Sequence, residues 1–180
     1  MDSLLPQAYL IGLILLLAGA AVVVARQILR VRRDELALSR LLTKDSSKPS
    51  DAAGLYELAS VQLRKRLYDQ AIDNLKLAAK RAVADGEPLE ARALIQNALG
   101  FSLAAQSDYK AAIKHYRLAL EAKPDYPVAL NNLAFAFEKQ QKFEEAQRTY
   151  EKVLQLEAGN KTAKKRLKLL ERKGGFNEAA

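Results

Sequence analysis

Apolar residues follow two patterns along this chain, an unbroken run near the start and a helical periodicity after it. Residues 8–25 carry no charge, and apart from Tyr9 and two glycines they are all Leu, Ile, Val or Ala. At about 1.5 Å per residue they form a helix of roughly 27 Å, close to the roughly 30 Å hydrocarbon core of a bilayer. The run therefore predicts a membrane-spanning helix with Tyr9 at an interface.

Two other interpretations of the run stay open, a cleaved signal peptide and a buried core helix. Residues 18–20 (Ala-Gly-Ala) resemble a cleavage site, but a signal peptide carries positive charge before its apolar run, where this chain has only Asp2. Four arginines follow the run instead, namely Arg26, Arg30, Arg32 and Arg33. Because Lys and Arg accumulate on the cytoplasmic side, these arginines predict an N-terminus outside, a remainder in the cytoplasm or stroma, and contacts with anionic headgroups.

Leucines at helical spacing continue beyond the arginines, so we expect residues 1–43 to form the anchor and a juxtamembrane helix that ends near Thr43. Residues 44–51 then read Lys-Asp-Ser-Ser-Lys-Pro-Ser-Asp. Ser, Asp and Pro compete with or block helix hydrogen bonds. This segment predicts a hinge before a separate domain.

The rest of the chain repeats itself. Residues 108–113 (Asp-Tyr-Lys-Ala-Ala-Ile) match residues 142–147 (Lys-Phe-Glu-Glu-Ala-Gln) at an offset of 34. A third copy lies upstream at an offset of 41, so its repeat carries about seven extra residues around 83–89. An offset of 34 is typical of stacked helix–turn–helix units. We expect an all-α solenoid of three repeats at about 52–92, 93–126 and 127–160.

Recurrent residue types support this stack. Small residues are expected where helix axes cross, on the first helix of each unit (Ala59, Gly100, Ala134) and on the second (Ala71, Ala112, Ala146). Aromatic residues open the second helices (Tyr68, Tyr109, Phe143). Residues 161–173 predict a basic capping helix, with Leu167, Leu169 and Leu170 closing the stack and the basic residues facing water, before a flexible tail at 174–180.

This pattern resembles the tetratricopeptide repeat (TPR) over about residues 51–160. Val153 and Ala158 depart from it, because a small residue and a proline are usual there. In this family the first helices line a concave groove that binds protein segments. By spacing, the resemblance assigns to the groove Tyr56, Glu57, Ser60, Leu63, Arg64, Leu94, Asn97, Ala98, Phe101, Ala105, Val128, Asn131, Asn132, Phe135, Glu138 and Lys139.

The groove residues combine aromatic anchors with amides, which suits an extended or helical protein segment. An alternative stays open, that Phe101 and Phe135 only pack between helices. Some TPR proteins clamp the terminal carboxylate of chaperones, but Glu57 and Ala98 stand where that clamp needs Asn. We therefore do not expect a chaperone-tail clamp.

Composition narrows the function further. The chain has no Cys and one His, His115, expected on the surface away from the groove, so thiolate metal sites and His-based catalysis are not expected. The net charge is +8: the four arginines contribute +4 and residues 161–173 contribute +6, Asp2 and Glu178 subtract one each, and residues 34–160 are neutral. Such a distribution disfavours nucleic-acid binding. We expect neither enzyme activity nor a metal, cofactor or small-molecule substrate; the basic cap fits solubility with headgroup attraction, or an acidic partner.

A closer resemblance is to the photosystem I assembly TPR proteins of cyanobacteria and plastid genomes. It is carried by residues 97–101 (Asn-Ala-Leu-Gly-Phe), 130–139 (Leu-Asn-Asn-Leu-Ala-Phe-Ala-Phe-Glu-Lys), 166–172 (Arg-Leu-Lys-Leu-Leu-Glu-Arg) and 26–29 (Arg-Gln-Ile-Leu). The resemblance implies a single-pass thylakoid protein that binds photosystem I subunits or other assembly factors. A membrane-tethered adaptor for a pilus, cytochrome maturation or division machine remains the alternative.

Overall fold

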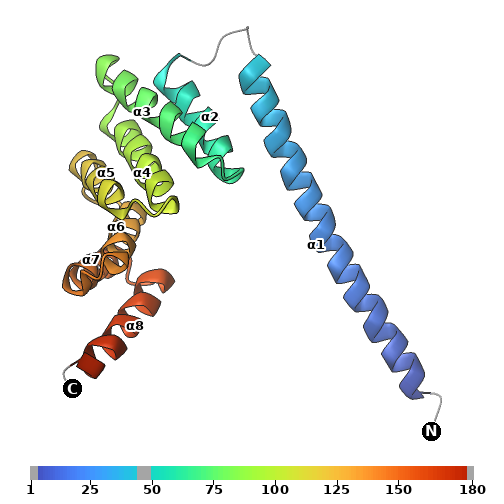
Figure 1. Ribbon diagram of the computed structural model, residues 1–180. Coiled ribbons are helices and arrows are strands. Elements are labelled where there is room, and N and C mark those ends of the chain that lie inside the picture. Colours follow the sequence, from blue (N-terminus) through green and yellow to red (C-terminus); the bar gives the residue numbers. More distant parts are fainter. Residues whose placement is uncertain (1–3, 44–49, 178–180) are drawn as a thin grey trace. The chain divides into compact units, whose positions relative to one another are not determined.

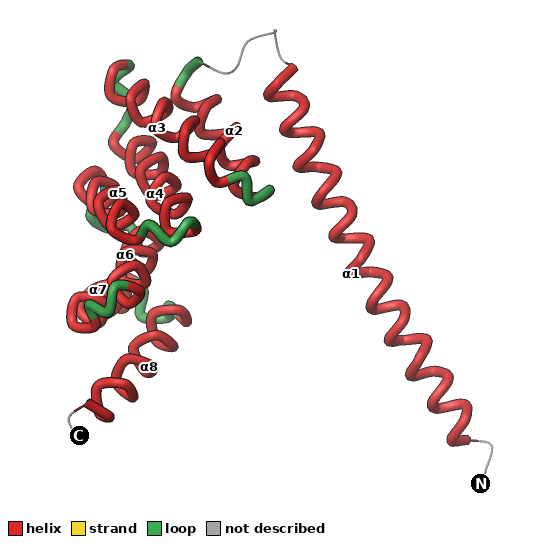
Figure 2. The backbone as a smooth tube through the Cα atoms, viewed as in Figure 1, coloured by secondary structure: helices red, strands yellow, loops and turns green. Residues whose placement is uncertain are grey.

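The computed structural model describes residues 4–43 and 50–177, and every regular element within these ranges is an α-helix (Figures 1 and 2). The chain divides into two compact units, residues 1–46 and 47–180. Each unit is described by itself. This confirms the all-α fold class.

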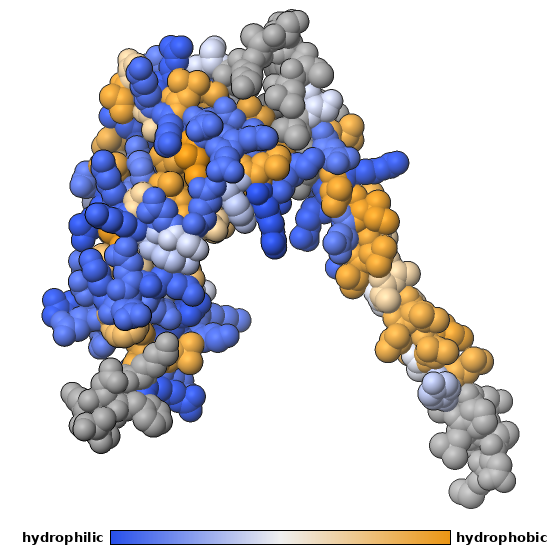
Figure 3. Space-filling model, in the orientation of Figure 1, coloured by the Kyte–Doolittle hydropathy of each residue, from blue (hydrophilic) through white to orange (hydrophobic). Residues whose placement is uncertain are grey.

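The first unit is one helix, α1 (Leu4–Thr43), of forty residues. Within the described residues it is the one helix long and apolar enough to cross a membrane, over Tyr9–Arg33, and none of that stretch is buried. Its apolar band is visible in Figure 3. The helix extends to Thr43, near which its end was predicted, and most of the predicted hinge, residues 44–49, lies outside the described residues.

The second unit is a stack of helices in which each pairs with its neighbours in the chain (Figure 1). The helices are α2 (Ala52–Arg64), α3 (Tyr68–Ala84), α4 (Leu89–Ala105), α5 (Tyr109–Ala122), α6 (Pro127–Lys139), α7 (Phe143–Leu156) and α8 (Lys161–Asn177). Asp51 caps α2, since its Oδ2 accepts a hydrogen bond from the Gly54 amide at 3.1 Å. Tyr68, Tyr109 and Phe143 each open a second helix, as predicted.

The small residues lie where the helices approach most closely. Ala59, Ala71, Ala112, Ala134 and Ala146 are all completely buried. Gly100 gives the clearest reason for a small residue, because a Cβ there would lie 2.7 Å from ring atoms of Tyr116 and 3.2 Å from the Ala112 carbonyl oxygen. Close backbone approach therefore fixes the identity of these positions.

The extra residues of the first repeat lengthen two helices instead of forming a loop. Helix α3 has 17 residues where α5 and α7 have 14, and α4 has 17 where α2 and α6 have 13. The predicted boundary between residues 92 and 93 consequently falls inside α4 rather than between helices. The sequence did not reveal the true boundary, because the added residues continue the helical pattern of α3 before Gly86 and of α4 after it.

The turns that follow the first helices α2, α4 and α6 share one backbone geometry, which the sequence does not predict because no glycine stands there. Arg66, Ser107 and Gln141 have φ of 61°, 67° and 60°, the left-handed region, although none is glycine. At each turn the next amide donates to a carbonyl of the preceding helix, for example Lys142 N to Phe137 O at 3.0 Å. These bonds form the same helix-ending motif three times and hold the strained residue in place.

Buried side chains form two apolar clusters, one over α2–α4 and one over α5–α8, and Leu103 packs against both. Helix α8 joins the second cluster through Ala163, Leu167 and Leu170. The prediction for Leu169 was wrong, because 40% of that residue is exposed, on a different face of the helix from Leu167 and Leu170. Helix α8 also continues to Asn177, beyond its predicted end at residue 173.

Candidate functional site

Three apolar residues among the predicted groove positions face solvent rather than the core. The exposed fractions are 43% for Leu94, 47% for Phe101 and 54% for Val128. Behind them, Ile95, Leu99 and the neighbouring core residues of the same helices are buried. Each of the first helices α4 and α6 therefore packs one apolar face against the core. Other apolar side chains of the same helices are exposed and available to a ligand. Exposed Phe101 does not pack between helices.

The α2 end of the groove contains a small apolar cavity of about 140 Å³. It is lined by Ala52, Ala53, Tyr56, Glu87, Ala91, Leu94 and Ile95. Ala91 lies in the added first turn of α4, so the lengthened repeat builds one wall of the cavity. Its size suits a single apolar side chain rather than a whole ligand.

The other predicted residues of α2 are arranged differently. Glu57 is exposed. The Ser60 hydroxyl donates to the Tyr56 carbonyl at 2.8 Å, and the Arg64 guanidinium donates to the Ser60 carbonyl at 3.3 Å. Ser60 and Arg64 thus bond to the backbone of their own helix, which reduces their capacity to bind a guest.

Two predicted amides are joined across the first helices. Asn132 Nδ2 donates to Asn97 Oδ1 at 3.0 Å, and Asn97 Nδ2 donates to the Tyr126 hydroxyl at 3.4 Å. Because an amide nitrogen has two N–H groups and its oxygen two lone pairs, each Asn keeps capacity for another hydrogen bond. Burial, and then the proximity of Tyr56, raise the pKa of the Tyr126 hydroxyl above its usual value. Sequence reasoning missed Tyr126, which lies before α6 rather than on a first helix.

The α6 end of the groove is enclosed by aromatic and cationic groups. The ring of Phe135 meets the edge of Tyr109, with centroids 6.5 Å apart and an interplanar angle of 78°. Lys139 Nζ lies 5.3 Å and Arg166 Cζ 5.0 Å from the centroid of the Phe135 ring. These are cation–π distances. Unlike Phe101, Phe135 is half-buried and already has neighbours on several sides.

Two polar residues of α6 are partly buried, so they are less available to a guest than their positions predict. Glu138 Oε1 accepts from Arg166 of α8 at 3.2 Å, and the side chain of Glu138 is only 13% exposed. The prediction that all basic residues of α8 face water was therefore wrong for Arg166. The carboxylate also lies beside Tyr150, where burial first and this negative charge second raise the pKa of the Tyr150 hydroxyl. The Oδ1 atom of Asn131 is also buried.

His115 lies behind the groove, on α5, as predicted. Its Nδ1 is 2.8 Å from Gln96 Oε1 of α4, and burial first, then Lys114 and Lys76, lower the pKa of the imidazole. Within the described residues, no group of three or more His, Asp or Glu side chains is placed to hold a metal ion.

Three of the four predicted headgroup contacts gather on one side of α1. Arg26, Arg30 and Arg33 line one surface depression together with Leu29, as expected for residues three and four apart on a helix. Arg32 is also exposed. The structure contains no membrane, so headgroup binding by these arginines stays a prediction.

Comparison with known proteins identifies the repeats and the relatives. The tetratricopeptide repeat family model matches residues 103–168. The uncharacterized protein ycf37 of Guillardia theta is 34% identical over 170 residues, 94% of this chain and 94% of that protein. The corresponding protein of Cyanophora paradoxa is 32% identical over 95% of this chain and 98% of its own length.

A longer relative comes from Arabidopsis thaliana, the tetratricopeptide repeat domain-containing protein PYG7, chloroplastic. It is 32% identical over 88% of this chain, which spans about half, 52%, of its length. Among solved structures, the first TPR of Spaghetti (RPAP3), bound to an HSP90 peptide, has a TM-score of 0.63 at 23% identity over 69% of this chain and 93% of that one. MamA has a TM-score of 0.64 at 22% identity, covering 79% and 77%.

The structural similarities show the TPR fold, and the sequence similarities extend across α1 as well as the repeats. Such folds typically serve as scaffolds for protein interaction rather than as enzymes. With at least 32% identity to two relatives over nearly the full length of each, the chain belongs to the ycf37 family of tetratricopeptide-repeat proteins.

Proposed function

We propose that this protein is a single-pass thylakoid protein whose TPR groove binds photosystem I subunits or other assembly factors and so assists assembly or stability of photosystem I. The observation that carries the proposal is a groove that exposes Leu94, Phe101 and Val128 in a chain related to a chloroplastic TPR protein along most of its length. The photosystem assignment rests on the family resemblance.

The anchor supports a role at a membrane surface. The stretch Tyr9–Arg33 of α1 is exposed; its apolar part is followed by four arginines that favour a cytoplasmic or stromal position of the repeats. Tethering two binding partners to one membrane raises their effective concentration to a level at which weak contacts suffice. A groove with a small apolar cavity and a few exposed anchors fits such modest affinity.

The direct test replaces Phe101, Asn132 and Phe135 together by Ala in the full chain, expressed in a photosynthetic host that lacks its own copy. We expect photosystem I subunits or assembly factors to be lost from cross-linked pull-downs of solubilised membranes, and photosystem I content to fall. The matched control replaces Leu77, Val83 and Leu156, which are exposed apolar residues of second helices. Unchanged pull-down by the groove variant would move the binding site elsewhere.

Orientation is tested separately with a reporter fused after Ala180. We expect activity of a reporter that works only in the cytoplasm or stroma. A lumenal or periplasmic result would overturn the proposed orientation and favour the second candidate, a tethered adaptor for another membrane machine. Pilus, cytochrome maturation or division proteins in the pull-down, without photosystem I subunits, would favour the same alternative.

A further inference from the structure

Helix α8 occupies the position of a further first helix. Helix α8 begins at Lys161, 34 residues after the start of α6 at Pro127. At this repeat offset, Arg166 is equivalent to Asn132 and Leu169 is equivalent to Phe135. Asn160 caps it through Oδ1, which accepts from the Ala163 amide at 3.0 Å, much as Asp51 caps α2. The groove positions of the repeats therefore have structural counterparts on α8.

One flank of α8 continues the groove. Ala163, Leu167 and Leu170 are buried against the stack, and Arg166, next to this stripe, reaches Glu138 and Phe135 of α6. At about 100° per residue, the surface beyond Arg166 carries Leu169, Lys165 and Arg172. Lys164, Lys168 and Glu171 fall on the opposite flank. Leu169 is 40% exposed, so an apolar side chain stands among the cations of the groove flank.

We infer that the groove extends onto this flank of α8 and that its α8 end binds an acidic segment of a partner protein. The inference rests on the proposed use of the groove for protein binding and specifies which part of a partner enters it. Lys139, Lys165 and Arg172 are exposed there, while Glu138, the acid of α6 nearest to them, is already paired with Arg166.

Charge differs along the groove and gives a guest one favoured direction. At the α2 end the exposed carboxylate of Glu57 is balanced by the exposed guanidinium of Arg64, the middle carries uncharged Leu94, Asn97 and Phe101, and the α8 end is basic. An acidic segment is attracted to the cations of the α8 end and not to the α2 end, which has no net charge, so charge sets its orientation as well as its affinity. Beside it, exposed Leu169 and Phe101 offer apolar contacts.

A protein segment fits this surface better than a membrane does. Arg166 is only about a third exposed, at 35%, and is held by Glu138 and Phe135 on the same side as the groove residues. A flat bilayer meets protruding side chains and would use Lys164 and Lys168 as readily as Lys165 and Arg172, because headgroup attraction depends on net charge near the surface. This difference separates the two ligands experimentally.

The test uses the full chain in native membranes, with Leu169 replaced by the photo-reactive residue benzoylphenylalanine. After irradiation, mass spectrometry identifies what is attached. We expect a protein segment with a clear excess of Asp and Glu. The control carries the same residue at Leu77 of α3, which is similarly exposed at 43%, and should not capture that segment. A neutral or basic segment, lipid alone, or no adduct at Leu169 would overturn the inference.

Charge reversal provides the matched pair of variants. Lys165→Glu with Arg172→Glu should lower the yield of the Leu169 adduct by about tenfold, whereas Lys164→Glu with Lys168→Glu should change it by less than about twofold. Both pairs change the net charge equally and involve only exposed residues. Equal losses would contradict a local site. If the first pair fails to fold, Lys165→Gln with Arg172→Gln repeats the comparison.

The outcomes also separate this inference from the proposed function. An acidic segment from a protein unrelated to photosystem I would support the α8 site and contradict the assembly role. A photosystem I subunit captured through a neutral or basic segment would support the assembly role and contradict the α8 site.

Discussion

Phe101 of α4 and Phe135 of α6 occupy the same place in consecutive repeats, yet their surroundings differ. Phe101 is 47% exposed, while Phe135 is half-buried against Tyr109 and flanked by Lys139 and Arg166. Two cations and a neighbouring acid therefore surround one ring and leave the other open. The same residue at the same register serves as an exposed anchor in one repeat and as part of a cluster in the next.

The difference teaches that a capping helix changes the chemistry of the groove as well as closing the core. Helix α8 buries Leu167 and Leu170 to cover the last apolar surface, and in doing so brings Arg166 onto Phe135 and Glu138. The α4 part of the groove keeps its apolar character, whereas the α6 part becomes charged. Four changes test this comparison, in order of expected effect.

The largest effect should come from Gly100→Ala, at a buried position of α4 next to exposed Phe101. A Cβ at Gly100 would lie 2.7 Å from the Tyr116 ring, whereas the third repeat has Ala134 at the same place against its own helix partner. Tyr116 is almost completely buried, so its ring can move aside only by disturbing the core. We expect a loss of about 1–3 kcal/mol in the free energy of unfolding.

Urea unfolding of the full chain in detergent, followed by far-ultraviolet circular dichroism, measures this loss. Gly159→Ala is the control, because nothing lies within 4 Å of a Cβ added at Gly159. Unchanged stability of Gly100→Ala would show that the two repeats cross with the same spacing, and that the glycine has another cause.

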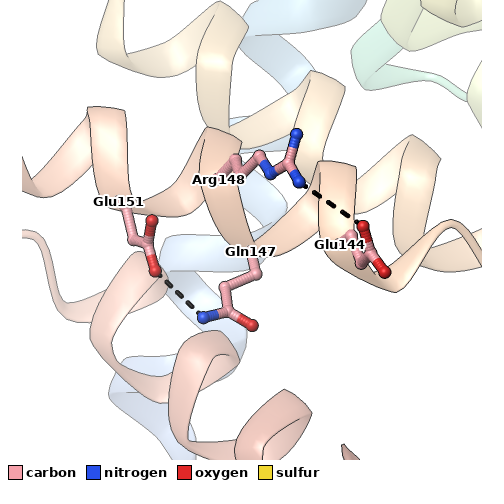
Figure 4. A network of polar contacts seen from close by, with 4 residues as sticks. All are labelled: Glu144, Gln147, Arg148 and Glu151. Atoms are coloured by element: carbon pink, nitrogen blue, oxygen red, sulfur yellow. Dashed lines mark hydrogen bonds and ion pairs between the residues drawn. The ribbon is translucent and has the colours of Figure 1, made fainter.

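The second change removes Arg166, the cation that α8 places on Phe135 and Glu138 of α6. Arg166→Ala leaves Glu138, whose side chain is 13% exposed, without its ion-pair partner. Arg166 is itself 35% exposed, so solvent screens part of the interaction and we expect a loss of about 1–2 kcal/mol. Arg148→Ala is the control, since Arg148 pairs with Glu144 at 3.5 Å on exposed α7 (Figure 4), with side-chain exposures of 76% and 85%.

The control should lose less than about 0.5 kcal/mol, as exposed pairs within one helix do. The neighbouring contact in Figure 4, Gln147 to Glu151 at 3.0 Å, is equally exposed and stays intact in that variant. A double-mutant cycle with Glu138→Gln isolates the pair energy from lost packing on Phe135. Equal effects of the two arginine variants would contradict a special role of α8.

The third change should affect both repeats alike. Ser107→Gly and Gln141→Gly place the residue that favours positive φ at the turns after α4 and α6. Each should raise the free energy of unfolding by about 0.5 kcal/mol, because relief of backbone strain exceeds the greater freedom of glycine in the unfolded chain. Gly86 shows the backbone geometry without this strain, because it is a glycine with φ of 68°. A gain at only one turn would reveal different strain in the two repeats.

The smallest effect is a pH dependence confined to the second repeat, since His115 is the chain's only histidine. Burial and two nearby lysines lower its pKa in the folded state below the ordinary value of 6.5, so the unfolded chain binds the proton more readily. This contribution to stability is complete above pH 6.5 and is lost as the pH falls through the lowered pKa. His115→Gln should flatten the urea midpoint in that window; an unchanged slope would contradict the assignment.

The sequence by itself determined the helices, their order and their spacing. Helical periodicity is local, and the crossing of two helices demands small residues such as Gly100 at fixed intervals, so both leave a pattern that one chain displays. The uncharged run of residues 8–25 likewise indicated a long apolar helix without reference to any other part of the molecule. The repeat register also predicted which residues line the groove.

Only the tertiary structure decided which of those groove residues are exposed. Asn97 and Asn132 hydrogen-bond to each other, Glu138 pairs with Arg166, and Leu169 faces solvent while Leu170 is buried. These contacts join residues up to 35 positions apart and depend on the rotation and docking of whole helices. A periodic pattern indicates which side of a helix is apolar, but the neighbour that lies across from each polar side chain is fixed only when the helices pack.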